Sequence, residues 1–484
     1  MALKDLAAGA GFIFITHEEY LIGEQMNKEN FAGFYKKSVA ERQRIVSREF
    51  ALNDSEKTLL TKEGPLQFEV ANRLIENVIG TFPLPMGLAT NFVIDGKEYI
   101  IPFVLEEPSV VAAASNGAKL STGFTTKADE PIMIGQVQLV SKNPSENIIG
   151  NSNGNSAGNP STASNGNVTN AALKIVTAKK ELLEFLKNVD PILVKFGGGP
   201  KDLISTVLKT ERGEMIEVQL LVDVRDAMGA NAINTMLEKL SPKLEELTGM
   251  EARLKIISNL AVYRKASATT VWTKEMLAES TKGEMTGDEI IERILDAYAF
   301  ALATPFRCAT HNKGIMNGID AVVIATGNDF RAIEAGAHAF ASYQRAYAPL
   351  TKYYKNKNGD LVGEIELPLA LGLVGGATKI HPLAQLSLKI LGVKSTQELA
   401  RIIASVGLAQ NFAAVRAIVT AGIQSGHMKL HAKNIAVQAG ANEKEIDEVA
   451  QKMVEAKEVN QAKAESILKE LRGSAPSKGK MIIS

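Results

Sequence analysis

The sequence predicts an α+β protein, and three observations carry this prediction. Residues 288–343 and 382–421 have the apolar spacing of helices, in which side chains three and four positions apart share one face. Between residues 178 and 258, helical and strand patterns alternate in a block that we interpret as a unit of its own. The turn pair Asp95-Gly96 joins two apolar runs, which indicates a β-hairpin over residues 92–104.

The other elements follow from local patterns along the chain. Residues 28–63 are charged and favour helix, and the apolar spacing over 67–78 predicts a helix that stops before Gly80. Residues 443–471 carry two charged amphipathic helices that join near Asn460. In the remaining segments we predict helices over 108–120, 178–188 and 231–247, and strands over 217–224 and 254–258.

Residues 143–170 form a low-complexity segment rich in Asn, Ser and Gly. Such a composition buries too little apolar surface to order itself, so we expect a disordered surface insertion here. The sequon at Asn167 carries little weight, because the N-terminal residues do not have the pattern of a secretory signal.

Composition bounds the class of protein. The chain has 484 residues, of which 45% are hydrophobic and 22% charged, as expected of a globular protein of about two to four domains. Basic and acidic residues are balanced at 54 each, which gives no electrostatic basis for binding nucleic acid or an anionic membrane. The single cysteine, Cys308, fits a reducing, cytoplasmic compartment. No window reaches the roughly 18 apolar residues of a membrane span, so we expect none.

The clearest chemical signal is a lysine set among small and amide residues. Lys313 is flanked by Asn312 and Gly314. An acid, Asp329, follows sixteen positions later, after an apolar run. We expect partial desolvation of the lysine ammonium, which then needs an acid to keep its proton, and Asp329 is the nearest candidate. A buried Lys–Asp pair facing a cleft suits a reaction that builds negative charge on a carbonyl oxygen.

A second candidate is Glu76, which lies near a predicted helix end, before a glycine and two prolines. A glutamate close to a turn is usually a solvated surface acid. Because the neighbours Ile75, Val78 and Ile79 are apolar, burial with a raised pKa is the alternative. A carboxyl group that stays protonated could then donate a proton.

Two histidines, His427 and His431, are four residues apart and would share one face of a helix. That spacing can bind zinc, but Met428 replaces the glutamate of the zinc-protease motif and no third ligand is near, so we expect no metal site. We interpret His427 as a proton donor at the hinge of a mobile segment, since histidine titrates near neutral pH. Cys308 lacks a base beside it, which favours a structural role over a nucleophile.

Backbone amides, rather than a phosphate-loop motif, are available to a nucleotide. Gly229 lies where a predicted strand passes into a helix, and amides at a helix start can bind phosphate, although an ordinary capped helix is the alternative. Three glycines at 197–199 allow close approach of the backbone to a ligand. Neither the Rossmann fingerprint after a strand nor the P-loop motif occurs, which excludes both fold types by fingerprint.

Six motifs lie in a characteristic order along the chain. They are ENVIG (76–80), DAMGAN (226–231), HNKGIMNGI (311–319), ATGND (325–329), GLVGGATKIHPLAQ (372–385) and GHMKLHAKN (426–434). Together they closely resemble the 3-hydroxy-3-methylglutaryl-coenzyme A (HMG-CoA) reductases of class II, the soluble bacterial and archaeal type. The resemblance covers nearly the whole chain except the low-complexity insertion.

The resemblance implies interconversion of HMG-CoA with mevalonate and CoA, by two hydride transfers from a nicotinamide cofactor through mevaldyl-CoA and mevaldehyde. It assigns the catalytic roles to Glu76, Lys313, Asp329 and His427. In these roles Lys313 stabilises the oxyanion, and Asp329 holds Lys313 charged and couples it to Glu76. A protonated Glu76 donates a proton as mevaldehyde is reduced, and His427 protonates the departing CoA thiolate.

The resemblance also assigns the binding residues. Those that hold the carboxylate and hydroxyl of the substrate are Arg307, Asn317 and Asn411. Those that contact the cofactor are Asp190, Asp226, Met228, Gly229, Asn231 and Asn259. An acid at Asp190 would accept a hydrogen bond from the ribose 2′-hydroxyl and repel a 2′-phosphate, which favours NAD(H). The neighbouring Lys195 is the residue that could shift the preference to NADP(H).

The resemblance further implies the domain layout. A large, mainly helical domain comprises residues 1–105 and 263–420, and a small, non-Rossmann α+β domain that binds NAD(P) is inserted as residues 106–262. Residues 421–484 form a C-terminal helical flap that closes over the substrate. Family members place the active site at a homodimer interface, often within a trimer of dimers.

Two alternatives were weighed. The first is another acyl-CoA or aldehyde oxidoreductase with the same lysine-centred chemistry, which the presence of Arg307 and Asn317 disfavours. The second is a non-catalytic CoA- or nucleotide-binding regulator, which the intact set of four catalytic residues disfavours.

Overall fold

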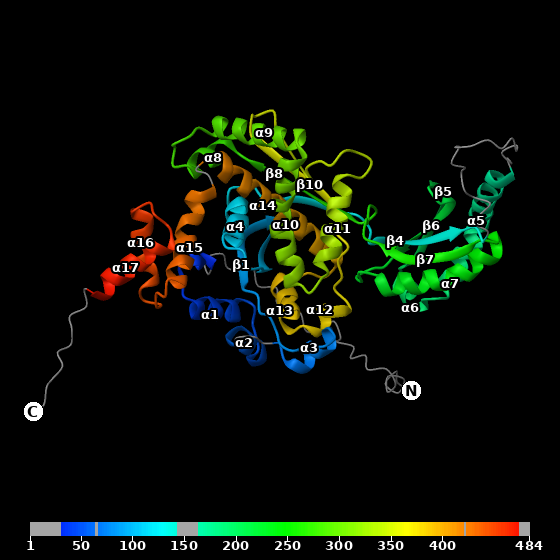
Figure 1. Ribbon diagram of the computed structural model, residues 1–484, viewed down its shortest axis with the longest axis horizontal. Coiled ribbons are helices and arrows are strands. Elements are labelled where there is room, and N and C mark those ends of the chain that lie inside the picture. Colours follow the sequence, from blue (N-terminus) through cyan, green and yellow to red (C-terminus); the bar gives the residue numbers. More distant parts are fainter. Residues whose placement is uncertain (1–30, 63–65, 143–162, 421–422, 474–484) are drawn as a thin grey trace, which may run out of the picture. The chain divides into compact units, whose positions relative to one another are not determined.

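The structure is a computed structural model, and it describes residues 31–62, 66–142, 163–420 and 423–473. The chain divides into two compact units, Met1–Thr61 and Lys62–Ser484, and each is described by itself. Both helices and small sheets are present, which confirms the predicted α+β class (Figure 1).

The described part of the first unit is helical, as its sequence predicts. It contains a short 3-10 turn at Phe34–Lys36 and two helices, α1 (Val39–Glu49) and α2 (Asp54–Thr61). A capping box starts α1, because the Ser38 side chain accepts from the amide of Glu41 while the Glu41 carboxylate accepts from the amide of Ser38.

The predicted hairpin lies near the start of the described part of the second unit, after one short helix. Strands β1 (Met86–Ile94) and β2 (Lys97–Val104) pair antiparallel. Asp95 and Gly96 both have positive φ, at 49° and 80°, which is the backbone that a two-residue turn of this kind requires. The hairpin begins six residues before the predicted start at residue 92. The predicted helix over 67–78 is shorter than expected, since α3 (Phe68–Leu74) ends at the extended residue Ile75.

Helices of different lengths form the centre of the second unit. They are α4 (Val110–Lys119), α8 (Lys274–Ser280), α9 (Gly287–Ala303), α10 (Pro305–Ala325), α11 (Phe330–Ala341), α12 (Gly376–Ile380), α13 (Pro382–Leu391) and α14 (Thr396–Val419). Helices α10 and α4 both pack on α14 (Figure 1). A β-carbon on Gly117 of α4 would lie 2.3 Å from the carbonyl oxygen of Ala409, so only glycine allows this approach to α14.

Helix α14 corrects one expectation from the sequence. By length and composition it could cross a membrane, although we expected no such window in the chain. Of its most apolar window, 72% is buried inside the protein. Phe412 on this helix stacks on Trp272 with the ring centroids 3.8 Å apart. The apolar residues of α14 therefore serve the core of the unit.

A four-stranded antiparallel sheet packs on these helices, and the sequence analysis did not predict it. Its order is β3 (Thr125–Ala128), β8 (Lys265–Trp272), β10 (Leu361–Pro368) and β9 (Thr351–Lys355). Strand β8 alternates strictly between buried and partly exposed residues. The buried positions before Trp272 are Ala266, Ala268 and Thr270, whose small side chains give a weak hydrophobic signal.

A second four-stranded sheet lies within residues 132–258. Its order is β5 (Gly199–Thr210), β6 (Gly213–Asp223), β4 (Ile132–Val140) and β7 (Glu251–Ser258). Every pair in it is antiparallel, whereas a Rossmann fold requires parallel strands, so the non-Rossmann expectation is confirmed. Helices α5 (Ala163–Lys187) and α7 (Ala230–Thr248) pack on this sheet and on each other (Figure 1).

The last residues of the low-complexity segment are helical in the structure. Residues 143–162 lie outside the described residues. Residues 163–170 form the first turns of α5, which contradicts the expected disorder for that part. Val168 is buried, and so is Ile175, two turns further along the same face of the helix. These apolar residues anchor the first turns of α5.

The last three helices, α15 (Ile423–Gln438), α16 (Ile446–Glu455) and α17 (Gln461–Gly473), share a hydrophobic cluster separate from the main core. Its members include Ala432, Ile435, Val449, Met453 and Leu468. The two predicted helices that join near Asn460 correspond to α16 and α17. The flap boundary at residue 421 remains a prediction.

Candidate active site

Helix α10 carries three of the predicted site residues. Arg307 lies in its first turn, and Lys313 and Asn317 lie one turn apart on one face. The helix is fixed at Asn312, which is fully buried. The Asn312 side chain donates to the carbonyl oxygen of Ala348 over 3.1 Å and accepts from the amide of Leu350 over 3.0 Å.

The structure gives Lys313 a different partner from the predicted one. Its ammonium donates to Oε2 of Glu107 over 2.9 Å, and the side chains of Lys313 and Glu107 are 60% and 39% exposed. The expected burial of Lys313 against Asp329 is therefore wrong for a single chain. The apolar neighbours of Lys313 in sequence lie on the opposite, buried faces of α10, where they meet the core.

Asp329 has a different local role. It is the N-cap of α11, where its carboxylate accepts from the amides of Arg331 and Ala332. It also pairs with the Arg331 guanidinium at 3.1 Å. Lys313 lies twelve residues before the end of α10, an axial separation of about 18 Å. The helical run between Lys313 and Asp329 thus keeps them apart within one chain.

Glu76 lies in an exposed segment that follows α3. Its side chain is exposed, and its neighbours Ile75 and Ile79 are 64% and 99% exposed, so the single chain has the solvated surface acid and not the buried alternative. Within the described ranges, Glu76 has no hydrogen-bond or ion-pair partner. The apolar residues around it are free to meet another surface.

Asn411, on α14, is 1% exposed and its side-chain amide is engaged on both sides. Its Nδ2 donates to the carbonyl oxygen of His311 over 3.0 Å. Its Oδ1 accepts from the hydroxyls of Thr351 at 3.2 Å and Tyr353 at 2.8 Å. Asn411 therefore connects α14, α10 and β9, and its predicted contact with substrate stays a prediction.

This network fixes the state of His311. A carbonyl oxygen only accepts, so Nδ2 of Asn411 must face it, and Oδ1 must face the two hydroxyls. Thr351 gives its one proton to Asn411 and must accept from Nε2 of His311, which lies 2.6 Å away. His311 is therefore the neutral Nε2–H tautomer, with a buried Nδ1 that has no protein partner in the described chain. Burial lowers the pKa of His311 to about 3.

Arg307 has the properties of an anion-binding residue. Its guanidinium is half-buried, and the burial lowers its pKa. No carboxylate pairs with it among the residues that the structure describes. A desolvated guanidinium without a counter-ion suits a bidentate carboxylate ligand.

Three of the sequence motifs meet in space. Asn328 of ATGND accepts from the amide of Gly372 of GLVGG over 2.7 Å. A β-carbon on Gly372 would lie 2.9 Å from the amide nitrogen of Met228 in DAMGAN, so only glycine allows the two loops to approach. The Asp226 carbonyl oxygen accepts from Leu373, and its carboxylate accepts from the amide of Thr396 at the start of α14.

A buried arginine that the sequence analysis missed stabilises this junction. Arg264 is 5% exposed, and its guanidinium donates to the carbonyl oxygens of Ala227 at 3.1 Å and Leu371 at 2.6 Å. Burial lowers its pKa to about 10, while the nearby Asp226 and Asp223 act against that shift. Arg264 belongs to none of the six motifs, so its role becomes visible only from its burial in the fold.

Four of the predicted cofactor residues lie at or just before the start of α7, namely Asp226, Met228, Gly229 and Asn231. Gly229 is its N-cap, with φ of 100°, and neither a side-chain cap nor an acid occupies the first turn. The first amides of this helix are thus available to an anion. Asn231 in this turn and Asn259 after β7 are exposed, and Met228 is partly exposed.

Asp190 caps a short helix, α6 (Pro191–Lys195). Its Oδ1 accepts from the amide of Leu193 over 2.9 Å. The other carboxylate oxygen makes no hydrogen bond within the described residues. Next to it, Ile192 and Phe196 expose large apolar side chains, at 68% and 67%. A planar ring could bind beside the acid here.

The side chain of His427 lies outside what the structure describes. Its backbone belongs to α15, as does that of His431, so the two positions do share one helix. No group of three metal-ligating side chains occurs among the described residues. Cys308 is fully buried, and burial raises its pKa, which favours the structural interpretation.

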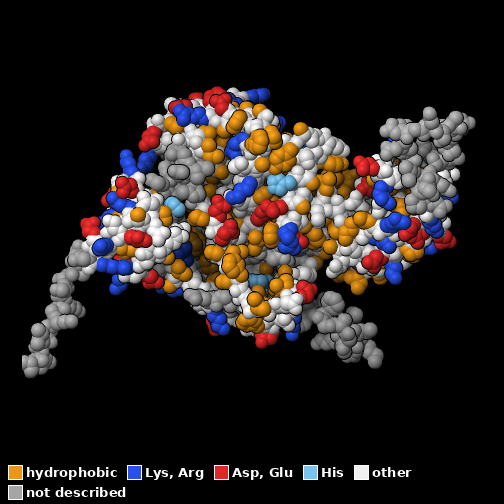
Figure 2. All heavy atoms as spheres, in the orientation of Figure 1, with side chains coloured by type: hydrophobic (Ala, Val, Ile, Leu, Met, Phe, Trp, Pro, Cys, Tyr) orange, Lys and Arg blue, Asp and Glu red, His pale blue; other side chains and the backbone are white. Residues whose placement is uncertain are grey.

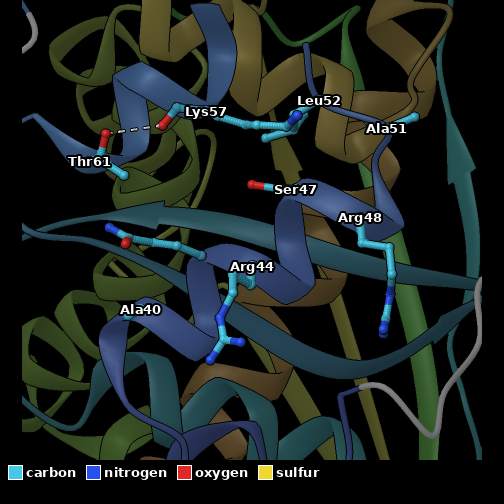
Figure 3. A pocket seen from close by; sticks show the side chains of 9 residues that line it. Ala40, Arg44, Ser47, Arg48, Ala51, Leu52, Lys57 and Thr61 are labelled. Carbon is cyan, nitrogen blue, oxygen red and sulfur yellow. Dashed lines mark hydrogen bonds between the residues drawn. The ribbon is translucent and has the colours of Figure 1, made fainter. Parts of the chain in front are cut away.

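A cavity of about 680 Å³ lies in the first unit, between α1 and α2 (Figure 3). It is lined by residues that include Arg44, Leu52 and Lys57. None of the predicted site residues lines it. On the face shown in Figure 2, acidic and basic side chains are interspersed with exposed apolar groups.

Comparison with known proteins identifies the family. The profile of hydroxymethylglutaryl-coenzyme A reductase matches residues 38–432. The 3-hydroxy-3-methylglutaryl-coenzyme A reductase of Archaeoglobus fulgidus is 51% identical over 443 residues, which cover 91% of this chain and 94% of that protein.

Two solved structures from Streptococcus pneumoniae are similar. One is a class II 3-hydroxy-3-methylglutaryl-CoA reductase bound to NADPH in open conformations, with 42% identity, a TM-score of 0.71 and coverage of 90% of this chain and 100% of that chain. The other, also a 3-hydroxy-3-methylglutaryl-coenzyme A reductase, has 42% identity, a TM-score of 0.72 and coverage of 91% and 100%. These matches agree with the three motifs that meet in space and with the antiparallel sheet of β5, β6, β4 and β7. They show that the chain belongs to the HMG-CoA reductase family, in its class II form.

Proposed function

We propose that this protein is an HMG-CoA reductase, which interconverts HMG-CoA with mevalonate and CoA. The single observation that carries this function is the match of the family profile over residues 38–432, together with 51% identity to the archaeal enzyme. A bound nicotinamide cofactor supplies two hydrides. The side chains of this chain bind the substrate, stabilise charge and move protons.

Lys313 is proposed to stabilise the oxyanion that develops when hydride reaches the thioester carbonyl. Its ammonium is exposed on α10 and held by a single carboxylate, so it can turn towards a ligand. His427 protonates the departing CoA thiolate, and Glu76 donates a proton as the aldehyde is reduced. Asp329 keeps the lysine charged. All four roles follow from the motif positions.

Two copies of the chain are proposed to build one site. Within one chain the helix separates Lys313 from Asp329, so a site that uses both takes them from two copies. Exposed apolar side chains support a homodimer, since Phe300, Leu302 and Phe306 are 61%, 53% and 87% exposed around the junction of α9 and α10. We extend this proposal to a trimer of dimers on the family pattern alone.

Arg307 is proposed to bind the free carboxylate of the hydroxymethylglutaryl group. Its half-buried guanidinium lacks a carboxylate partner among the described residues, and burial strengthens a charge-assisted pair. Asn317, one turn beyond Lys313 on α10, is proposed to hold the substrate hydroxyl. Asn411 acts at the same site, either by contact or through its bonds to His311.

The cofactor is proposed to bind with a phosphate at the start of α7, where Gly229 leaves the first amides open. Met228, Asn231 and Asn259 surround this helix end or follow the neighbouring strand. We favour NAD(H), because the free oxygen of Asp190 suits a ribose 2′-hydroxyl. The streptococcal relative is described with NADPH, and Lys195 is the residue here that would support a 2′-phosphate.

The ratio of cofactor to thiol tests the proposed reaction. Purified protein is given HMG-CoA and excess NADH or NADPH, and oxidised cofactor and free CoA thiol are counted in parallel. We expect two cofactors per thiol, because the thioester is reduced to an alcohol. One per thiol would favour an acyl-CoA reductase that stops at the aldehyde, and none would favour a non-catalytic regulator. A cytoplasmic location is part of the proposal, supported by the single, reduced Cys308.

A further inference from the structure

The buried side chain of Arg264 holds two loops together through their backbone carbonyl groups. Its Nη1 donates to the carbonyl oxygen of Ala227 at 3.1 Å and, more weakly, to that of Met228 at 3.5 Å. Its Nη2 donates to the carbonyl oxygen of Leu371 at 2.6 Å. Ala227 and Met228 lie in the loop that leads into α7. One guanidinium therefore sets the positions of two loops that are far apart in the sequence.

The backbone of Arg264 is itself fixed. Its amide donates to the carbonyl oxygen of Ala261 over 2.9 Å, and its own carbonyl oxygen accepts from the amide of Leu369 over 3.0 Å. It comes directly before β8, whose first residue pairs with Pro368 of β10. The side chain thus reaches from the sheet that contains β8 and β10 to the loop that follows β6 in the other sheet. An anchored residue of this kind can impose a conformation on the loop that it contacts.

These hydrogen bonds set the direction of the next two backbone amides. In a trans peptide the carbonyl and N–H groups point to opposite sides, and no cis peptide occurs among the described residues. Because the carbonyl groups of Ala227 and Met228 face Arg264, the amides of Met228 and Gly229 face away from it. Neither amide donates to another group within the described ranges. They therefore extend the row of free amides at the start of α7.

The surroundings of these amides suit an anion. A β-carbon on residue 372 would lie 2.9 Å from the amide nitrogen of Met228, so the glycine there leaves this amide uncovered. Gly229 has φ of 100°, in the left-handed region, and the first turn of α7 contains no acid. Consecutive amides at such a turn form a concave site that binds phosphate oxygens.

The arrangement requires an arginine. A planar guanidinium presents donors in several fixed directions, whereas a lysine ammonium is a point charge on a flexible stem. Burial lowers the pKa of Arg264 only to about 10, so the side chain is charged at neutral pH. The alternative is a purely structural role, in which the guanidinium only satisfies carbonyl groups that are buried at a junction. The two roles differ in what a substitution does to cofactor binding.

We propose that Arg264 is a positioning residue for the cofactor, which turns the amides of Met228 and Gly229 towards the diphosphate that binds at the start of α7. The role rests on the proposed function, which places a phosphate of the nicotinamide cofactor at this helix end. HMG-CoA also carries a diphosphate, in its CoA part, so the test has to distinguish the two molecules.

Two lysine variants separate positioning from stability. Arg264→Lys keeps the charge and loses the fork of donors. Arg416→Lys is the matched control, because Arg416 is also desolvated and donates to neutral groups, Ser280 at 2.8 Å and Asn116 at 3.0 Å. Circular dichroism and urea unfolding establish that each variant is folded and how much stability it loses. Steady-state kinetics then gives KM for NADH and KM for HMG-CoA separately.

We expect Arg264→Lys to raise KM for NADH by about tenfold, the equivalent of one lost charge-assisted hydrogen bond. KM for HMG-CoA and kcat at saturating cofactor should stay within about threefold, because the lost contact binds the ground state and the transition state alike. Arg416→Lys should leave both KM values within the same limits. Equal effects of the two variants on KM for NADH would overturn the proposal. A rise in KM for HMG-CoA alone would also overturn it, since the amides would then serve the diphosphate of CoA.

A second readout does not need turnover. Calorimetric titration measures the Kd of NADH and of ADP-ribose, which keeps the diphosphate and lacks the nicotinamide. In Arg264→Lys both Kd values should rise by about tenfold, because the two molecules share the group that the amides bind. A loss of affinity for NADH with unchanged affinity for ADP-ribose would overturn the assignment to the diphosphate.

A third measurement uses the wild type alone, so it does not depend on the folding of a variant. Hydrogen–deuterium exchange of the peptide that contains Met228 and Gly229 should slow when ADP-ribose is bound, since both amides then donate to the diphosphate. Unchanged exchange at saturating ADP-ribose would overturn the proposal. A wild type that shows this protection but does not turn over HMG-CoA would contradict the proposed function alone, and one that binds neither NADH nor ADP-ribose would overturn both.

Discussion

Asn411 donates from its side chain to the carbonyl oxygen of His311 over 3.0 Å, and this bond ties the central helix α14 to the helix that carries Lys313. The same amide accepts from the hydroxyls of Thr351 and Tyr353. A buried amide with three hydrogen bonds to different elements fixes one arrangement of its neighbours. The position of the lysine therefore depends on an amide that is itself enclosed in the core.

Replacement of Asn411 should destabilise the protein as well as lower its activity. Asn411→Ala leaves the two hydroxyl donors without an acceptor, at an expected cost of about 2–4 kcal/mol in the free energy of unfolding. Urea unfolding measures the loss. Asn317→Ala is the control, because its side chain makes no hydrogen bond to the described residues, and it should cost less than about 1 kcal/mol. Equal stability of the two variants would show that Asn411 has no structural role.

The cofactor preference can be tested without disturbing the helix cap. Asp190→Asn keeps an oxygen that can accept from the amide of Leu193 and removes the charge, whereas Asp190→Ala removes both. The ratio of kcat/KM for NADH to that for NADPH should fall by at least about tenfold in both variants, because the repulsion of a 2′-phosphate is lost.

The comparison of the two Asp190 variants separates charge from cap. If the ratio of kcat/KM for NADH to that for NADPH changed only in Asp190→Ala, the cofactor preference would depend on the cap of α6 and not on the charge of Asp190. An unchanged ratio in both would show that Asp190 does not face the ribose.

The thiolate role of His427 predicts a selective loss. His427→Gln should reduce turnover of HMG-CoA by about 100-fold or more, as removal of a general acid does. Reduction of free mevaldehyde releases no thiolate and should be nearly unaffected. The two rates are measured with the same enzyme preparation. Equal losses on both substrates would contradict thiolate protonation.

The free energy of unfolding should fall as pH rises, because Asp320 is a buried acid. Burial and the neighbouring Glu334 raise the pKa of Asp320 to about 8. An unfolded aspartate titrates near 3.9, so between about pH 4 and pH 8 the unfolded state loses a proton that the folded state keeps, and stability is lost as pH rises. One oxygen of Asp320 is buried without a hydrogen-bond partner in the described chain.

Asp320→Asn removes this proton and should flatten the pH dependence. We expect a higher urea midpoint than the wild type at pH 8, and a gain in the free energy of unfolding that is larger there than at pH 5.5 by up to about 3 kcal/mol. Asp296→Asn, at an exposed position, is the control and should show no such pH dependence. A larger gain at pH 5.5 than at pH 8 would contradict the assignment.

The sequence was sufficient where a local rule fixes the structure. Asp95-Gly96 specifies its turn because both residues adopt positive φ, and the turn of the hairpin is where the sequence predicts it. Strand β8 was missed because alanine and threonine carry its buried face. Residues 163–170 are helical because the apolar side chains that follow, such as Ile175, bury one face of α5.

The site shows a sharper limit. The residues around Lys313 single it out, but within one chain it pairs with Glu107 and not with Asp329, because closeness along the chain is lost when the intervening residues form a helix. Glu107 could not be found from the sequence, since 206 residues separate it from Lys313 and the fold alone brings them together. Arg264 belongs to no motif, and its role depends on burial.

The most direct test of the central claim is absorbance at 340 nm with wild-type protein and Lys313→Ala, HMG-CoA, and NADH and NADPH in separate assays. The account predicts HMG-CoA-dependent oxidation of cofactor by the wild type, with a higher kcat/KM for NADH than for NADPH. It predicts no oxidation above background by a folded Lys313→Ala. Wild-type activity that survives in Lys313→Ala, or a folded wild type that oxidises neither cofactor, would contradict it.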